Sequence, residues 1–212
     1  DVDFGFQTGF GIETLECILD EIAAVIDFAH RYRDEAERVG NKEVADMFAV
    51  IPEQGAQTFQ QALQFLRLLN FCIWFNIKYL ITFGRFDQYM YPFYEADIKA
   101  GRLDYNGAYD LVQEFFLALN RDSDLYYGVQ VGDNGQSIVL GGCDEDGNDA
   151  YNDISEMCID ACRENNLIDP KINLRVNKDT PLERYIKGSE LTKIGLGFPQ
   201  YENDDVIIPG LL

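Results

Sequence analysis

The chain contains a single histidine, His30, and this limits the catalytic chemistry that it can support by itself. Zinc centres commonly use two or three imidazoles, and Ser-His-Asp or Cys-His catalysis needs an imidazole beside the nucleophile. His30 lies within residues 28–32 (Phe-Ala-His-Arg-Tyr), inside a spacing of apolar residues that is typical of a helix. We interpret it as a partly exposed helix residue rather than a catalytic one.

The thiols of the chain do not form a complete ligand set either. Cys158 and Cys162 are four residues apart and share one helix face, but a thiolate metal site normally needs a second pair. Cys17 and Cys72 lie in apolar helical sequence and are predicted to be small core residues. Together with Cys143 they make five, an odd number with no secretory signal before it, which favours free thiols in a reducing compartment. We expect no metal site.

Two short loops resemble ligand-binding motifs only in composition. Residues 143–149 (Cys-Asp-Glu-Asp-Gly-Asn-Asp) are acidic, but an EF-hand needs glycine at its sixth position, and counted from Asp144 that position is Asp149. A turn through Gly147, followed by a helix that begins near Asp149, is the better interpretation. Residues 195–197 (Gly-Leu-Gly) lack the strand, helix and third glycine of a dinucleotide-binding loop.

The charge of the chain excludes several partners. Its 17 Lys and Arg residues against 37 Asp and Glu residues give a net charge of −20. Nucleic-acid phosphates and anionic membrane surfaces attract clustered cations, so neither is an expected partner. The apolar run at 68–77 is too short to span a bilayer. We therefore expect a cytoplasmic protein that is kept soluble by charge repulsion.

Apolar spacing and turn residues predict an α/β chain. Helices are expected over 11–39, 42–50, 58–80, 92–100, 106–119 and 149–165, and strands over 125–131, 137–140 and 172–176. Residues 84–89 are predicted to form a polar and aromatic loop. Thr180 is expected to cap a helix with Pro181 at its first position, and Ser189 to begin a further short helix. Strands that alternate with helices from residue 125 onward favour parallel β/α units.

Six short sequence blocks, which occur in order along the chain, are more informative than these general patterns. They are 84–89 (GRFDQY), 91–94 (YPFY), 136–142 (QSIVLGG), 146–150 (DGNDA), 170–176 (PKINLRV) and 197–205 (GFPQYENDD). This series resembles the glycyl radical enzymes of the pyruvate formate-lyase superfamily, and within it the dehydratase and lyase branch. The resemblance is dense from about residue 52 to residue 212.

The resemblance implies a fold and a mechanism. The fold class is α/β, and the chain would form about half of a ten-stranded β/α barrel with long packed helices on the outside. Residues 1–57 would be an N-terminal helical segment, and 58–212 a partial barrel domain. In such enzymes a cysteine on one finger loop becomes a thiyl radical, and a glycine on a second loop stores the radical. A separate radical SAM activase installs it, and the full enzyme is expected to be a homodimer.

The chain departs from the family pattern in the parts that carry the radical. The cysteine loop, the glutamate two residues after that cysteine, and the glycyl radical segment are not present in these 212 residues. None of the five cysteines matches the catalytic position, so we assign no catalytic residue and no bound cofactor. We expect the chain to be part of a longer enzyme, with the glycyl radical outside it.

Substrate-binding residues are predicted from their places beside these blocks. Tyr79 and Phe83 precede the block at 84–89, and Gln136 begins the strand before Gly141-Gly142. Barrel sites lie at strand ends, so we predict that these three residues line the substrate pocket, and ordinary core packing is the alternative for each of them. Diol and glycerol dehydratases of the family carry a His-Ser pair where this chain has Tyr79 and Leu80. That difference argues against a glycerol-type substrate.

Two other functions stay open on the sequence. An acyltransferase like pyruvate formate-lyase would use two adjacent cysteines in the missing loop, whereas a lyase or dehydratase would have the cysteine followed by glutamate two places later. The second possibility is a non-catalytic fragment or accessory subunit that binds a partner chain.

Overall fold

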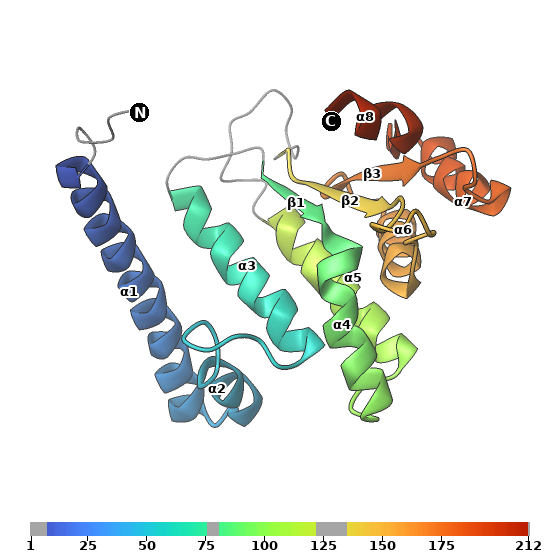
Figure 1. Ribbon diagram of the computed structural model, residues 1–212. Helices are drawn as coiled ribbons and strands as arrows, with labels where there is room; N and C mark the ends of the chain where they lie inside the picture. The colour runs from blue at the N-terminus through green and yellow to red at the C-terminus, as the bar shows by residue number, and fades with distance from the viewer. Residues whose placement is uncertain (1–7, 76–80, 122–134, 212) are drawn as a thin grey trace. The chain divides into compact units, whose positions relative to one another are not determined.

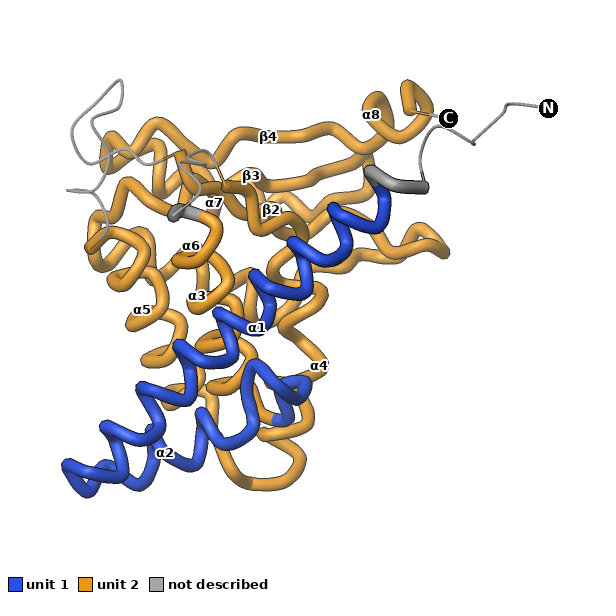
Figure 2. The backbone as a smooth tube through the Cα atoms, turned by 90° about the vertical axis from the view of Figure 1, so that its left-hand side faces the viewer, with its two compact units in different colours: residues 1–57 blue, residues 58–212 orange. Residues whose placement is uncertain are grey.

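The computed structural model describes residues 8–75, 81–121 and 135–211 (Figure 1). The chain separates into two compact units, 1–57 and 58–212, which are coloured in Figure 2. That these units are two domains of the protein stays a prediction. In the described ranges, no helix is long and apolar enough to cross a membrane.

The first unit is a pair of helices, α1 (Thr8–Val39) and α2 (Lys42–Phe48). His30 is a partly exposed helix residue, as predicted: it lies in α1, its side chain is 31% exposed, and its Nε2 lies 3.4 Å from a carboxylate oxygen of Glu53. The prediction for Cys17 is wrong, because this thiol is exposed. Glu13 lies four residues before Cys17, and Asp20 lies three residues after it. Residues at these spacings share one helix face, so Cys17 lies on an acidic face of α1.

The second unit is built on a parallel sheet with the strand order β1-β2-β3-β4. The strands are β1 (Thr82–Arg85), β2 (Ser137–Gly141), β3 (Lys171–Val176) and β4 (Gln200–Asn203), and each pairs in parallel with the next. The helices of this unit are α3 (Phe59–Phe75), α4 (Phe86–Lys99), α5 (Tyr105–Arg121), α6 (Asp153–Asn165), α7 (Leu182–Lys193) and α8 (Asp204–Leu211). The predicted alternation of strands and helices is confirmed, whereas the predicted strand at 125–131 lies outside the described residues.

One face of the sheet carries the hydrophobic core. Ile138 and Leu140 of β2 and Ile172 and Leu174 of β3 are at most 1% exposed, and they alternate with half-buried residues. Figure 1 shows α4, α5 and α6 together on one side of the strands. The stacked rings of Phe86 (α4) and Phe115 (α5), whose centroids are 5.7 Å apart, form part of this layer.

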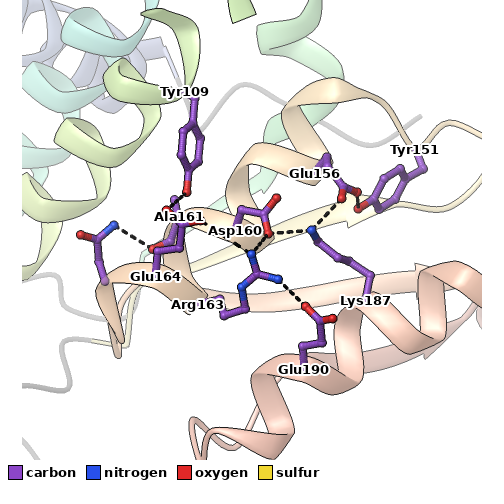
Figure 3. Close-up of polar contacts among 10 residues, drawn as sticks. Tyr109, Tyr151, Glu156, Asp160, Ala161, Arg163, Glu164, Lys187 and Glu190 are labelled. Carbon is purple, nitrogen blue, oxygen red and sulfur yellow. Dashed lines mark hydrogen bonds and ion pairs between the residues drawn. The ribbon is translucent and has the colours of Figure 1, made fainter. Parts of the chain in front are cut away.

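Charged and phenolic side chains fasten α6 to its neighbours (Figure 3). The ammonium of Lys187 on α7 lies 2.7 Å from a carboxylate oxygen of Glu156 and 2.6 Å from one of Asp160. Arg163 of α6 pairs with Asp160 at 2.7 Å and also with Glu190 of α7. The α6–α7 contact therefore depends on two cations that are each shared between carboxylates.

Several predicted boundaries are corrected by the structure. Residues 84–89 are not a loop, because β1 ends at Arg85 and α4 begins at Phe86 and runs through Pro92. The buried residues Phe86, Met90 and Tyr94 recur every four positions and hold α4 against the core despite the proline. The helix predicted from residue 149 begins at Asp153, after a capping box made by Asn152 and Ser155.

The region after residue 176 also differs from the prediction. Thr180 does not cap a helix. Its hydroxyl accepts the backbone N–H of Asn177 at 2.8 Å, and Pro181 occupies the N-cap position of α7. One continuous helix, α7, runs past Ser189 to Lys193, so no new helix begins at Ser189. Gly188 lets β4 approach this helix, because a Cβ at this position would lie 2.6 Å from the hydroxyl of Tyr201. The strand β4 and the helix α8 were not predicted.

Candidate functional site at the carboxyl edge of the sheet

The second face of the sheet is mainly polar, in contrast to the face that packs on the helices, although Val139 of β2 lies on it beside Asn173. Its residues alternate with the buried ones and lie beside one another across the strands: Thr82 and Ser137, then Asn173 and Gln200, then Arg175 and Glu202. These side chains are half-buried or exposed among the described residues. Parallel sheets are normally covered on both faces, so a polar second face is typical of a wall that lines a ligand space.

Arg85 and Asp87 clamp the turn that follows β2 from two sides. A guanidinium nitrogen of Arg85 donates to the carbonyl oxygens of Gly141 and Cys143, each at 3.0 Å. Asp87 Oδ2 accepts the backbone N–H of Gly141 and the hydroxyl of Ser155, both at 2.6 Å. Together the two side chains fasten the turn at 141–143.

The electrostatic state of Asp87 follows from its position. The residue is 0% exposed. Burial raises the pKa of Asp87 above its usual value, although hydrogen bonds from the Gly141 N–H, the Ser155 hydroxyl and the Gln88 side chain and the positive charge of Arg85 act in the opposite direction. Asp87 is therefore a buried carboxyl group held between opposing effects at the first turn of α4.

The same turn is tied to β3 and β4. Gly142 donates its N–H to the carbonyl oxygen of Arg175 at 3.1 Å and adopts a φ of +81°. Arg175 Nε lies 2.7 Å from Asp204 Oδ1, and the Cys143 thiol lies 3.7 Å from Asp204 Oδ2. The carboxyl ends of all four strands are thus joined by one polar network. Parallel α/β folds commonly place their functional groups at this edge.

Three of the described thiols are poorly suited to nucleophilic chemistry. Cys158 and Cys162 are buried in α6, and burial raises the pKa of both. Burial also raises the pKa of Cys72. A raised pKa keeps a thiol in its protonated and less reactive form.

No group of three or more His, Cys, Asp or Glu side chains among the described residues is placed to hold a metal ion. The acidic loop that resembles a calcium site folds as the predicted turn. Asp144 Oδ1 accepts the N–H groups of Asp146 and Asn148, at 2.9 and 2.8 Å, and Gly147 has a φ of +84°. The Asp144 carboxylate is therefore occupied within its own turn.

The structure places two of the three predicted substrate-binding residues. Phe83 is buried, with its ring 5.9 Å from that of Phe115 on the helix-facing side of the sheet. Gln136 is also buried, and it accepts a hydrogen bond from Asn70 and donates one to the Leu119 carbonyl. Tyr79 lies outside the described residues, as does Leu80. The pocket-lining role of these three residues stays a prediction.

Sequence reasoning missed the residues of the polar face, above all Asn173, Arg175 and Gln200. A signal was available in residues 171–176 (Lys-Ile-Asn-Leu-Arg-Val), where polar and apolar side chains alternate strictly. That alternation indicates a strand with one apolar and one polar face. No comparable signal exists for Gln200, because β4 is short and its side chains are mostly exposed.

Comparison with known proteins identifies the family. A family model described as pyruvate formate lyase-like matches residues 10–212. The chain belongs to this family. It is 30% identical to the (2S)-3-sulfopropanediol dehydratase of Klebsiella oxytoca, with 98% of this chain and 26% of that protein covered. It is 29% identical to the isethionate sulfite-lyase of Nitratidesulfovibrio vulgaris, with 92% and 26% covered.

The structural comparison agrees with the sequence comparison. A solved structure described for 1,2-propanediol dehydration in Roseburia inulinivorans superposes with a TM-score of 0.83 at 32% identity, covering all of this chain and 28% of that one. The relatives are dehydratases and a sulfite-lyase, and a glycyl radical enzyme from Archaeoglobus fulgidus superposes with a TM-score of 0.79 at 27% identity, so the predicted branch is confirmed. The chain spans about a quarter of their length. It has the α/β fold of a fragment of their barrels, and the count of ten strands stays a prediction.

Proposed function

We propose that this chain is a segment of a glycyl radical lyase or dehydratase that cleaves a C–O, C–N, C–S or C–C bond of a small organic substrate. The single observation that carries the proposal is the match of nearly the whole chain, in sequence and in fold, to dehydratases and a sulfite-lyase. Because the chain covers about a quarter of these relatives, the activity is proposed for the longer protein.

The role of this segment is to build one wall of the substrate space. The polar face of the sheet supports this role, because Asn173 and Gln200 present amide groups that can hydrogen-bond a hydroxyl, carboxylate or sulfonate. Tyr79, Phe83 and Gln136 remain proposed substrate-binding residues. The contacts of Gln136 and Phe83 toward the helices are those expected under the alternative of ordinary core packing.

The radical chemistry would come from outside the chain. A glycyl radical on another segment supplies a thiyl radical at a cysteine, and the thiyl radical removes a hydrogen atom from the substrate. A radical SAM activase is the proposed partner that installs the glycyl radical, and a homodimer and a cytoplasmic location are proposed for the full enzyme. None of the cysteines in this chain is assigned to the reaction. The protonated state of the buried thiols supports this.

The test is product formation by the full-length protein, activated anaerobically by its radical SAM partner. We would supply (2S)-3-sulfopropanediol, isethionate and 1,2-propanediol separately, and pyruvate with coenzyme A as a fourth reaction. Release of water or sulfite from one of the first three supports a lyase or dehydratase. Formation of formate in the reaction with pyruvate and coenzyme A, with no product from the other three substrates, would show the acyltransferase alternative. A protein that is inactive in all four reactions and co-purifies with a partner chain would favour the accessory subunit.

A further inference from the structure

The aromatic ring of Tyr151 lies against the turn that follows β2. A Cβ built on Gly141 would lie 3.5 Å from Tyr151 Cδ2, which is ordinary van der Waals contact. The preceding residue is bonded to the same turn, because Ala150 donates its N–H to the carbonyl oxygen of Gly142 at 3.0 Å. Tyr151 therefore reaches the carboxyl edge of the sheet from the segment that leads into α6.

Side chains of α6 and α7 hold this ring at its hydroxyl and at its face. The hydroxyl donates to a carboxylate oxygen of Glu156 at 2.6 Å, and the same carboxylate pairs with Lys187 (Figure 3). The guanidinium carbon of Arg184 lies 4.0 Å from the ring centroid, well within the range of a cation–π contact. The orientation of Tyr151 is thus fixed by the helices behind the sheet.

The turn that the ring contacts is joined to the polar face of the sheet. Gly142 donates its N–H to the carbonyl oxygen of Arg175 at 3.1 Å, and a Cβ at residue 142 would lie 2.9 Å from Arg175 Cβ. Arg175 lies beside Glu202 on the polar face and pairs with Asp204 at 2.7 Å. Because close-packed groups move together, a displacement of the turn would also displace Arg175.

We propose that Tyr151 is a positioning residue of the candidate site, which couples the α6–α7 ion pairs to the turn at 141–143 and so holds Arg175 in place on the polar face. The ring carries the coupling, since the turn and Arg184 both contact it, and the hydroxyl keeps the ring oriented. The consequence for substrate binding rests on the proposed function, whereas the fixing of the turn does not.

Hydrogen exchange of the full-length protein, measured by mass spectrometry on peptides that span 141–150, tests the fixing of the turn. In Tyr151→Leu we expect exchange in these peptides to be faster by about tenfold. Tyr151→Phe keeps the ring and should restore exchange to within about twofold of the wild type. Unchanged exchange in Tyr151→Leu would overturn the proposal.

Tyr109→Leu is the matched control. Tyr109 also donates its hydroxyl to a glutamate of α6, but it belongs to α5 and binds Glu164 in the last turn of α6, at 2.9 Å (Figure 3). This variant should leave exchange at 141–150 unchanged, and an effect equal to that of Tyr151→Leu would refute a local role for Tyr151.

Arg184→Met gives a second and milder test, because it leaves Tyr151 in place and removes only the cation from its face. We expect exchange at 141–150 to be faster by about threefold, as the loss of a cation–π contact implies. Unchanged exchange in this variant would contradict the role given to the ring and its stacked guanidinium.

Steady-state kinetics of the activated full-length enzyme separates positioning from stability. With whichever of the four substrates gives product, Tyr151→Leu should raise KM by about fivefold while kcat changes less than about twofold, and Tyr151→Phe should restore KM. A loss of stability alone reduces the amount of active enzyme, and therefore the apparent kcat rather than KM. Faster exchange with an unchanged KM would overturn the role in substrate binding. Inactivity of the wild type with all four substrates would contradict the proposed function, and hydrogen exchange would still decide whether Tyr151 fixes the turn.

Discussion

At the scale of single residues, the close packing at the carboxyl edge of the sheet requires a glycine at position 142. Gly142 has no room for a Cβ, because that atom would lie 2.9 Å from both Arg175 Cβ and Asp204 Oδ2. Its φ of +81° is also a conformation that other residues adopt only at a cost of about 1–2 kcal/mol. The Arg175–Asp204 pair and the turn after β2 can approach each other only because residue 142 is glycine.

Gly142→Ala should therefore destabilise the chain by about 2–4 kcal/mol, from backbone strain and overpacking together. Gly147→Ala is the matched control, since Gly147 has a similar φ of +84° but a Cβ added there would have nothing within 4 Å. The control should lose only about 1–2 kcal/mol. Urea unfolding of both variants measures the difference, and equal losses would mean that close packing at Gly142 contributes nothing.

The contribution of Glu156 to the stability of the folded state depends on pH. Burial raises the pKa of Glu156, but hydrogen bonds from Lys187 and Tyr151 outweigh it, so the pKa lies below its usual value. A carboxylate with a lowered pKa stabilises the folded state above its unfolded pKa of about 4.3, and this contribution is lost as the pH falls through the folded pKa. Glu156→Gln should lose less stability than the wild type on acidification below about pH 4. Parallel acid-unfolding curves would contradict this.

At the scale of elements, strongly patterned segments could be predicted from sequence and short polar ones could not. The spacing of apolar residues gave α1, α3 and α5 close to their observed positions. The strand β4 was missed because Gln-Tyr-Glu-Asn has no apolar alternation, and it is defined by pairing with β3. The helix α8 contains Pro209, and proline is unfavourable in the interior of a helix.

The same limit applies to the candidate site. Strand-end positions such as Phe83 and Gln136 could be found in the sequence, but the sheet face on which each side chain lies depends on register, and a shift of one residue reverses it. The contacts of Gln136 with Asn70 and Leu119 join residues that are 66 and 17 positions apart. No local pattern encodes such contacts.

Helix α6 offers a direct test of an element contact. Lys187 is shared by Glu156 and Asp160, so Lys187→Met leaves two half-buried carboxylates without their common cation. We expect a loss of about 1–2 kcal/mol in the free energy of unfolding. Lys178→Met is the control, because the Lys178–Asp179 pair is exposed and should contribute nothing measurable. Equal stabilities of the two variants would show that the α6–α7 network is not stabilising.

At the scale of the whole molecule, several large apolar side chains near the carboxyl-terminal end of the described chain are exposed. Leu182, Val206 and Leu211 are 73%, 68% and 82% exposed, and in the described sheet β4 is paired on one side only. Such surfaces and strand edges favour association with further protein. The net charge of −20 opposes association between copies.

The isolated chain should therefore self-associate, and more strongly at high salt, where charge repulsion is screened. Sedimentation velocity at low and high salt measures this, with Val206→Asp as the variant in which association is reduced. A monodisperse monomer at both salt concentrations would show that the exposed apolar side chains are not an association surface.

The most direct test of the proposed radical chemistry is electron paramagnetic resonance of the full-length protein after anaerobic treatment with its radical SAM activase. We predict an organic radical signal that disappears on exposure to oxygen and is centred on a glycine outside residues 1–212. A protein that is fully folded, incubated with an activase proven on another substrate protein, and still free of any radical signal would contradict this prediction.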